Sequence, residues 1–149
     1  CGGASSPTVD DAGVSAPPAS LELGTGSERF EPVEAHATFA LTRGCQGSQH
    51  VLVALRARGV RAERALLELT MTRARDGQRV AQTYLRLGLT PREDALEVAG
   101  LTLVVPAPDE ALGEELRLFA RLRDTDGVTV EASLALSLAW GPDGCAGHG

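Results

Sequence analysis

The chain of 149 residues contains no lysine, no asparagine and no isoleucine, and all 14 of its basic residues are arginine. The three missing amino acids have AT-rich codons, so a GC-rich genome explains their joint absence most simply. The arginine content by itself therefore carries little functional information. The net charge is -6, without a block of like charge. This balance disfavours nucleic acid as a partner, because nucleic-acid-binding domains need a basic patch.

The sequence also lacks the motifs of common catalytic and metal sites. Gly47-Ser48 continues into Gln49 and makes no nucleophile elbow, and Gly24-Thr25-Gly26-Ser27 has no lysine to hold a phosphate. Asp124 and Asp126 resemble the start of a calcium loop, but the third oxygen ligand is missing. We therefore expect a protein that is not an enzyme.

No apolar run approaches the roughly 20 residues that a membrane-spanning helix needs. The first segment, residues 1–19, is instead rich in small residues, proline and aspartate, with Val9 and Val14 as its larger apolar side chains. Such a segment buries too little apolar surface to offset its ordering entropy. We expect residues 1–19 to form a disordered, flexible linker.

Cys1, followed by Gly2, Gly3 and this linker, resembles the N-terminus of mature bacterial lipoproteins. The resemblance implies a covalent lipid on Cys1 and no other cofactor, with the membrane contacted through that lipid. Glycine instead of aspartate at position 2 implies the outer membrane of the cell envelope, on its periplasmic or surface face. The alternative is a chain that begins at cysteine for reasons unrelated to lipid.

From Ser20 onward, apolar and polar residues alternate with a period of two, as in half-buried β-strands. The apolar sets are Ala35, Ala37, Phe39 and Leu41; Val51, Val53, Leu55 and Ala57; Ala65, Leu67, Leu69 and Met71; Leu116, Leu118, Ala120 and Leu122; and the even-numbered residues from Val128 to Leu138. On a helix each set would be spread round the whole cylinder. The pattern therefore predicts strands, with helix nearly absent.

Two Asp-Gly pairs predict hairpin registers. A three-residue loop at 125–127 pairs Leu122 with Val130, so that the apolar residues of both strands share one face. A two-residue turn would place Leu122 opposite Glu131, on the wrong face. The same loop type at 75–77 opposes Met71 with Ala81.

Seven to eight strands at roughly ten-residue spacing predict an all-β, antiparallel, Ig-like β-sandwich over residues 20–141. The run from Leu21 to His50, with its Gly-Thr-Gly, Phe-Glu-Pro and Gln-Gly-x-x-His elements, resembles Ig-like lipoproteins of GC-rich Gram-negative bacteria. That resemblance implies no particular activity. Residues 142–149 are then a C-terminal tail.

Cys45 lies between two predicted strands and Cys145 lies in the tail. Outside the cytoplasm disulfides persist, and lipid on Cys1 would leave these two cysteines as a pair. We expect a Cys45–Cys145 disulfide that ties the tail to the sandwich. The alternative is a zinc or copper site made by Cys45, His50, Cys145 and His148.

Tyrosine, phenylalanine and arginine on outward-facing strand positions suit the centre of a protein interface. The residues expected to form such a contact face are Tyr84, Arg86, Arg117, Phe119 and Arg121. We expect a lipid-anchored structural or protein-binding subunit of the envelope, within a larger surface assembly and bound to another envelope protein. The alternatives are a metal-binding and a carbohydrate-binding lipoprotein.

Overall fold

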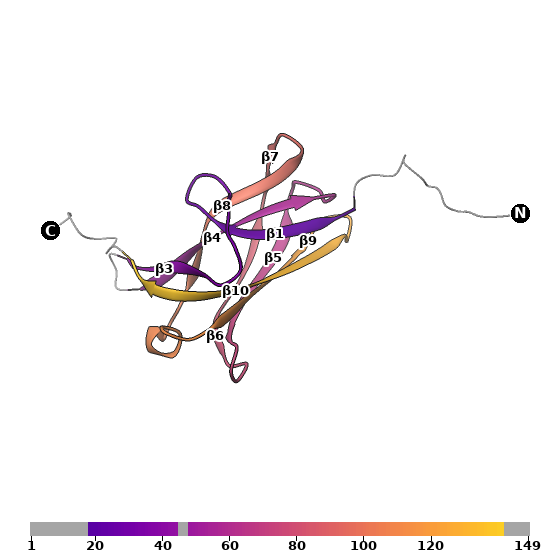
Figure 1. Ribbon diagram of the computed structural model, residues 1–149. Helices are drawn as coiled ribbons and strands as arrows, with labels where there is room; N and C mark the ends of the chain where they lie inside the picture. Colours follow the sequence, from indigo (N-terminus) through magenta and orange to yellow (C-terminus); the bar gives the residue numbers. More distant parts are fainter. Residues whose placement is uncertain (1–17, 45–47, 142–149) are drawn as a thin grey trace, which may run out of the picture.

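Ten β-strands and one short 3-10 turn make up the regular structure of residues 18–44 and 48–141, which the computed structural model describes (Figure 1). The elements in chain order are β1 Ser20–Thr25, β2 Glu31–Pro32, β3 Ala37–Arg43, β4 Gln49–Arg58, β5 Ala65–Arg73, β6 Arg79–Leu87, β7 Thr90–Arg92, β8 Ala95–Val104, the 3-10 turn Pro108–Glu110, β9 Leu116–Arg123 and β10 Thr129–Trp140. No helix in these two ranges is long and apolar enough to cross a membrane.

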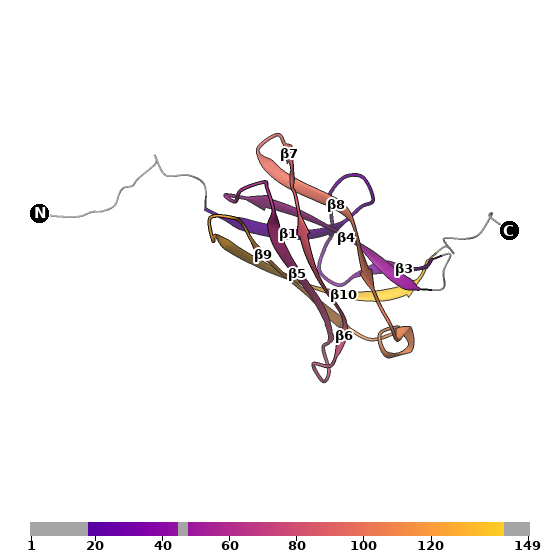
Figure 2. The same cartoon turned by 180° about the vertical axis from the view of Figure 1, so that it is seen from behind.

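The strands form two layers, which Figures 1 and 2 show from opposite sides. The β4 sheet has β4 at its centre, with β1 and β8 on either side and the short strands β2 and β7 beyond them. The β9 sheet runs in the order β3, β10, β9, β5, β6. Strand β3 joins the layers, because its first residues pair with β10 and its last two pair with β4.

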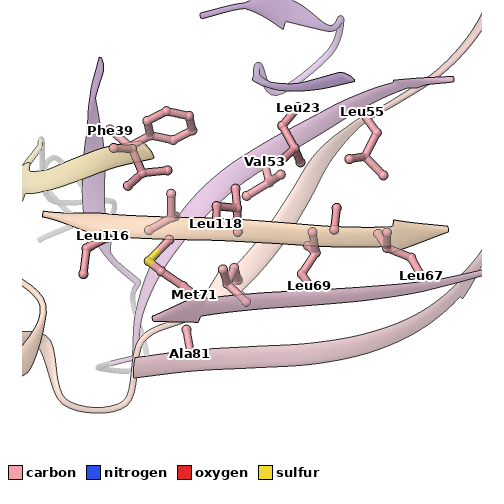
Figure 3. Packing of buried hydrophobic residues seen from close by; sticks show 14 of the residues in the cluster. Leu23, Phe39, Val53, Leu55, Leu67, Leu69, Met71, Ala81, Leu116 and Leu118 are labelled. Carbon is pink, nitrogen blue, oxygen red and sulfur yellow. The ribbon is translucent and has the colours of Figure 1, made fainter. Parts of the chain in front are cut away.

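The core fills the space between the two sheets. Figure 3 shows Val53 and Leu55 of the β4 sheet together with Leu69 and Met71 of the β9 sheet in this cluster, and all four are fully buried. Each belongs to an alternating apolar set of the sequence, so the period of two places one whole set on the inner face of its strand. At about 25 cal/mol per Å² of apolar surface, this burial is the main force holding the layers together.

The prediction of an all-β, Ig-like sandwich is confirmed. Eight of the described strands have six residues or more, and β2 and β7 add two and three residues. Both short strands contain a proline, Pro32 and Pro91. Proline lacks the N–H that a central strand needs, which explains why these strands are short and lie at the edges.

One ladder departs from the expected antiparallel arrangement. Strands β3 and β10 run parallel, with Ala37 paired to Leu136 and Leu41 to Trp140. Parallel neighbours need a long connection, and nearly the whole domain lies between these two strands. Local alternation cannot reveal this, because it reports which face a residue takes and not the direction of its neighbour.

The predicted register of the last hairpin is confirmed. Leu122 pairs with Val130, and the Asp124 N–H donates to the Val128 carbonyl at 3.0 Å. Gly127 adopts a φ of 88°, the left-handed conformation that this loop type requires.

The hairpin between β5 and β6 has the predicted strand register but a different loop. Met71 pairs with Ala81 as expected, whereas Thr72 pairs with Arg79, so Val80 is an extra residue in a β-bulge. The loop closes with the Arg73 N–H donating to the Gln78 carbonyl, which leaves four residues between them instead of three. The Arg73 side chain explains the change, because its guanidinium binds Asp76 at 2.7 Å and gathers the loop around itself.

Candidate interaction face

The outer face of the β9 sheet carries all five residues predicted to form a contact face. On β9, Arg117, Phe119 and Arg121 alternate with leucine and alanine side chains that are fully buried, so they point away from the core. On β6, Tyr84 and Arg86 are exposed and take the same face. The alternation read from the sequence therefore placed these side chains correctly.

Cross-strand pairing brings most of the five together over β5. Glu68 lies between Tyr84 on β6 and Arg121 on β9. Leu66, two residues before Glu68 on β5, lies between Arg86 on β6 and Arg123 on β9. Arg117 pairs with Thr72 at the opposite end of the strand, so it shares the face without joining this group.

A groove of about 360 Å³ lies over these rows. Its lining residues are Leu66, Leu67, Glu68, Tyr84, Leu85, Arg86, Arg121 and Arg123. Two of them expose large apolar surface, with Leu66 at 47% and Tyr84 at 66% of their possible area. An exposed leucine next to an exposed tyrosine, with arginines around them, has the composition of a protein interface centre.

Arg121 is held inside the face by its neighbours. Its Nε donates to Glu131 at 2.8 Å, and its guanidinium lies 3.9 Å from a Glu68 oxygen and over the Phe119 ring at 5.6 Å. Tyr84 is also oriented, because the Gln82 amide donates to its hydroxyl at 2.9 Å. Arg121 and Phe119 therefore stiffen the outer surface of the sheet.

The remaining arginines of the groove are not paired. Within the described residues, the side chains of Arg86 and Arg123 have no ion-pair or hydrogen-bond partner, and neither does that of Arg64, which precedes β5. Arg64 shares with Leu66, Arg86 and Arg123 a second hollow of about 230 Å³ that continues the groove. Asp124 and Thr125 complete its lining. Three solvated guanidiniums thus surround Leu66 on a protein whose net charge is negative.

The β9–β10 hairpin gives this end of the face a fixed backbone. Asp124 is buried, and its carboxylate accepts N–H bonds from Arg61 at 2.8 Å and from Asp126 and Val128, both at 2.9 Å. Burial acts to raise the pKa of Asp124, but the three backbone donors outweigh it and the pKa is lowered. Asp124 is therefore a charged structural group beside Arg123, and not a proton donor.

Part of the outer face of the β4 sheet is closed by the chain itself. The loop from Gly26 to Phe30 folds over it, so that Phe30 is only 6% exposed although it lies outside the core cluster. The Arg56 guanidinium lies 4.4 Å from the centre of the Phe30 ring and 3.4 Å from the buried carboxylate of Glu97. The charge of Glu97 and the apolar surface of Phe30 are thus buried within the domain, whereas Thr102 and Val104 of β8 stay exposed on the same face.

The loop closes because glycine lets two backbones meet. Gly100 has a φ of 72°, and a Cβ there would lie 2.8 Å from the Ser27 carbonyl oxygen. Its N–H donates to the Gly26 carbonyl at 2.9 Å, which ties the loop to β8.

The cysteine predictions lie outside the described residues. Cys1, Cys45, Cys145 and His148 all fall in the ranges 1–17, 45–47 and 142–149. His50, the remaining member of the alternative metal set, is half-buried at the start of β4, where it pairs with Thr42 and Val104. The disulfide, the lipid and the metal site thus remain predictions.

The exposed aromatic residues do not form a sugar-stacking platform in the part of the chain that the structure describes. Tyr84 lies on β6 at one edge of the β9 sheet, and Trp140 ends β10, with β9 and β5 between them. The Arg43 guanidinium covers the Trp140 ring at 4.6 Å. Neither ring offers a second aromatic face beside it, as a sugar-binding surface of this kind requires.

Sequence reasoning missed Leu66, Arg123 and Arg64. The signal for the first two was present, since each occupies an outward position between buried neighbours, and Leu66 is a large apolar residue on a polar face. Arg64 had no such signal, because it stands in a turn with a φ of 54°. Its place beside the groove depends on how the chain enters β5.

The fold is an all-β, Ig-like sandwich with an uncovered groove on the outer face of its β9 sheet. No protein-family model matches the chain, and no curated protein sequence matches it. Three solved structures are similar over most of the chain, all with TM-scores below 0.5, which is too low to transfer a function.

One is a glycosyl hydrolase family 2 member from Bacteroides cellulosilyticus, with TM-score 0.44 and 20% identity over 78% of this chain and 15% of that one. Another is an adhesin from Mobiluncus mulieris with disulfide, isopeptide and ester cross-links, with TM-score 0.44 and 12% identity over 82% and 58%. The third is the N-terminal domain of PorA, with TM-score 0.32 and 11% identity over 82% and 99%. The chain thus spans about 15% and 58% of the length of the first two proteins.

Proposed function

We propose that this protein is a lipid-anchored subunit of the cell envelope, without catalytic activity, that binds another envelope protein through the outer face of its β9 sheet. The observation that supports the proposal is the exposed pair Leu66 and Tyr84, set in a groove with unpaired arginines. Side chains that stay exposed to solvent add little to the stability of the fold. Their burial by a partner would stabilise a complex.

A photo-crosslinking residue at position 84 tests the contact in intact envelopes. The matched control carries the same residue in place of Thr102, which is exposed on β8 of the β4 sheet. We expect a defined adduct from position 84 that is absent from position 102 and is lost when Leu66→Ser is added. Equal labelling from both positions would refute a binding role for this face.

The anchor is tested separately at Cys1. Lipidation is expected to appear as the added mass of a diacylglycerol, with or without a further acyl chain, on protein extracted from membranes, and to be abolished by Cys1→Ser. The variant should then move from the membrane to the soluble fraction, because stable anchoring needs two or more acyl chains. If the native protein carried no lipid mass, the proposed anchor would be excluded, and the proposed contact face would not be affected.

The proposed Cys45–Cys145 disulfide has its own test. If the bridge forms, Cys45→Ser should lower the melting temperature more under oxidising than under reducing conditions, because a cross-link constrains the unfolded chain. Equal loss under both conditions would exclude it. Free-thiol counting on the intact protein distinguishes a bridge from a metal thiolate site.

A further inference from the structure

The edge of the β9 sheet next to the groove is an unpaired strand. Among the described strands, β6 pairs with β5 alone, and its nine residues contain no proline. The register is regular from Ala81 to Leu87, since the β-bulge lies at the other end, at Val80. Strand β8 of the other sheet comes close to β6 without pairing with it. The unpaired backbone N–H and C=O groups of such an edge can bond an extended segment.

The groove and the edge are contiguous. Tyr84, Leu85 and Arg86 belong to β6 and also line the groove. Tyr84 and Arg86 are two residues apart, so their side chains take the same face of the sheet. A strand added beside β6 would place its own alternate residues next to these two, one facing the tyrosine ring and the other the guanidinium.

The charge at the edge selects the added segment. Arg86 and Arg123 flank Leu66 by direct cross-strand pairing, and Arg64 opens onto the same hollow. All three are exposed and lack partners among the described residues, whereas Arg121 is already neutralised by Glu131 and Glu68. A guanidinium matches a carboxylate through two parallel hydrogen bonds, which makes acidic side chains the complementary group.

We propose that the occupant of this face is an extended acidic segment of the partner protein, which adds a strand to the β6 edge. Its pattern is an aspartate or glutamate facing Arg86, followed or preceded at the second position by an apolar residue beside Tyr84. Arg123 and Arg64 are the outer cations of the same groove and draw the acidic segment in. This inference rests on the proposed function and specifies the chemistry of its partner.

The test is a selection of displayed random 12-residue peptides on the full, membrane-extracted chain in detergent micelles. We expect enrichment of sequences that alternate acidic and apolar residues. The double variant Arg86→Glu/Arg123→Glu should weaken the best selected peptide by about tenfold or more, because an attractive charge contact becomes repulsive. Selection repeated on that variant should enrich lysine or arginine instead.

The matched control is Arg117→Glu, which changes an unpaired arginine of the same face outside the groove. It should alter the affinity by less than about twofold, since exposed charges beyond a Debye length are screened. Arg86→Gln with Arg123→Gln serves as a second variant if the charge reversal unfolds the domain, which the melting temperature reports. Hydrogen exchange should show slowed amides along β6 when the peptide is bound.

Several results would overturn the inference. Enrichment of basic or purely apolar peptides, or indifference to the double variant, would exclude an acidic occupant. Binding without protection of β6 amides would exclude strand addition. If the protein formed a concentration-dependent dimer that the double variant abolishes, the occupant would be a second copy of this chain. If the protein bound phosphatidylglycerol vesicles and the double variant weakened that binding as much as it weakens peptide binding, the occupant would be a lipid surface. A position-84 crosslink to a partner would in each case still support the proposed function.

Discussion

The two outer faces of this sandwich are built from the same alternating strands but differ in how much of each the chain itself covers. On the β4 sheet, the loop that contains Phe30 covers the strands, and Glu97 lies buried against Arg56. On the β9 sheet, no part of the described chain covers Leu66 and Tyr84. One loop thus covers part of the β4 sheet, although Thr102 and Val104 stay exposed there, whereas no loop covers the groove on the β9 sheet.

The difference extends to the arginines. Arg56 faces Glu97 and Glu22 on the closed side, and its guanidinium lies on the Phe30 ring. Arg86 and Arg123 on the open side have no partner in the described chain. Paired guanidiniums on the closed side serve stability, whereas unpaired ones cost nothing to keep in water and are free to meet a ligand.

The largest expected effect on stability comes from removing the ring of Phe30, which covers part of the β4 sheet. Phe30→Ala should lower the free energy of unfolding by about 3 kcal/mol, because it removes a buried ring and leaves a cavity under the loop. Urea unfolding followed by tryptophan fluorescence measures the change. The control is Tyr84→Ala on the open face, where we expect a loss below about 1 kcal/mol. Equal losses would mean that the two faces do not differ.

The next effect comes from the hairpin that supports the open face. Asp124→Ala should cost about 2 kcal/mol at neutral pH, because the buried carboxylate accepts three backbone N–H bonds. The control is Asp126→Ala at the exposed partner of the Arg61 side chain, which should cost less.

The same pair of variants predicts a pH dependence. The pKa of Asp124 in the folded protein lies below its ordinary value of 3.8, so its charge stabilises the fold above about pH 3.8. That contribution is lost as the pH falls through the lower, folded-state pKa. The gap in unfolding free energy between the wild type and Asp124→Ala should therefore narrow below about pH 3.8, and a constant gap would contradict this assignment.

A smaller effect on stability distinguishes the close approach of two backbones at Gly100 from the backbone strain of a positive φ alone. Gly100 and Gly77 share a φ of 72°, but a Cβ at position 100 would meet the Ser27 carbonyl, whereas nothing lies within 4 Å at position 77. Gly77→Ala should cost about 1 kcal/mol from the left-handed conformation, and Gly100→Ala about 1 kcal/mol more from displacement of the loop. Thermal unfolding of both variants checks this, and equal shifts would mean that the loop does not depend on the contact.

The smallest effect on stability is expected on the open face itself. Leu66→Thr and Tyr84→Thr should each change the free energy of unfolding by no more than about 0.5 kcal/mol, since both side chains are largely solvated and threonine suits a strand. Leu66→Thr should also abolish the crosslink from the photo-crosslinking residue at position 84. A large loss of stability would identify these residues as structural and remove the main support for a binding face.

The sequence predicted most of the two hairpins and the membership of the contact face. Register followed from the need to keep Leu122 opposite Val130, and the same reasoning placed Met71 opposite Ala81. It failed at the loop after Arg73, because an ion pair between a strand residue and a loop residue overrode the preferred loop length. The alternation of apolar and polar residues shows which face of a strand a side chain takes, and it does not show which loop side chains come near it.

By itself, the sequence determined which side of each strand faces the core, because a period of two leaves one choice once the apolar set is known. Only the tertiary structure decided that β3 runs parallel to β10, that the Phe30 loop closes one face, and that Leu66 with Arg86 and Arg123 stays open on the other. These features depend on contacts between segments far apart in the chain. Local patterns indicate toward which side of the strand a residue points, but they do not indicate which distant segment packs against it.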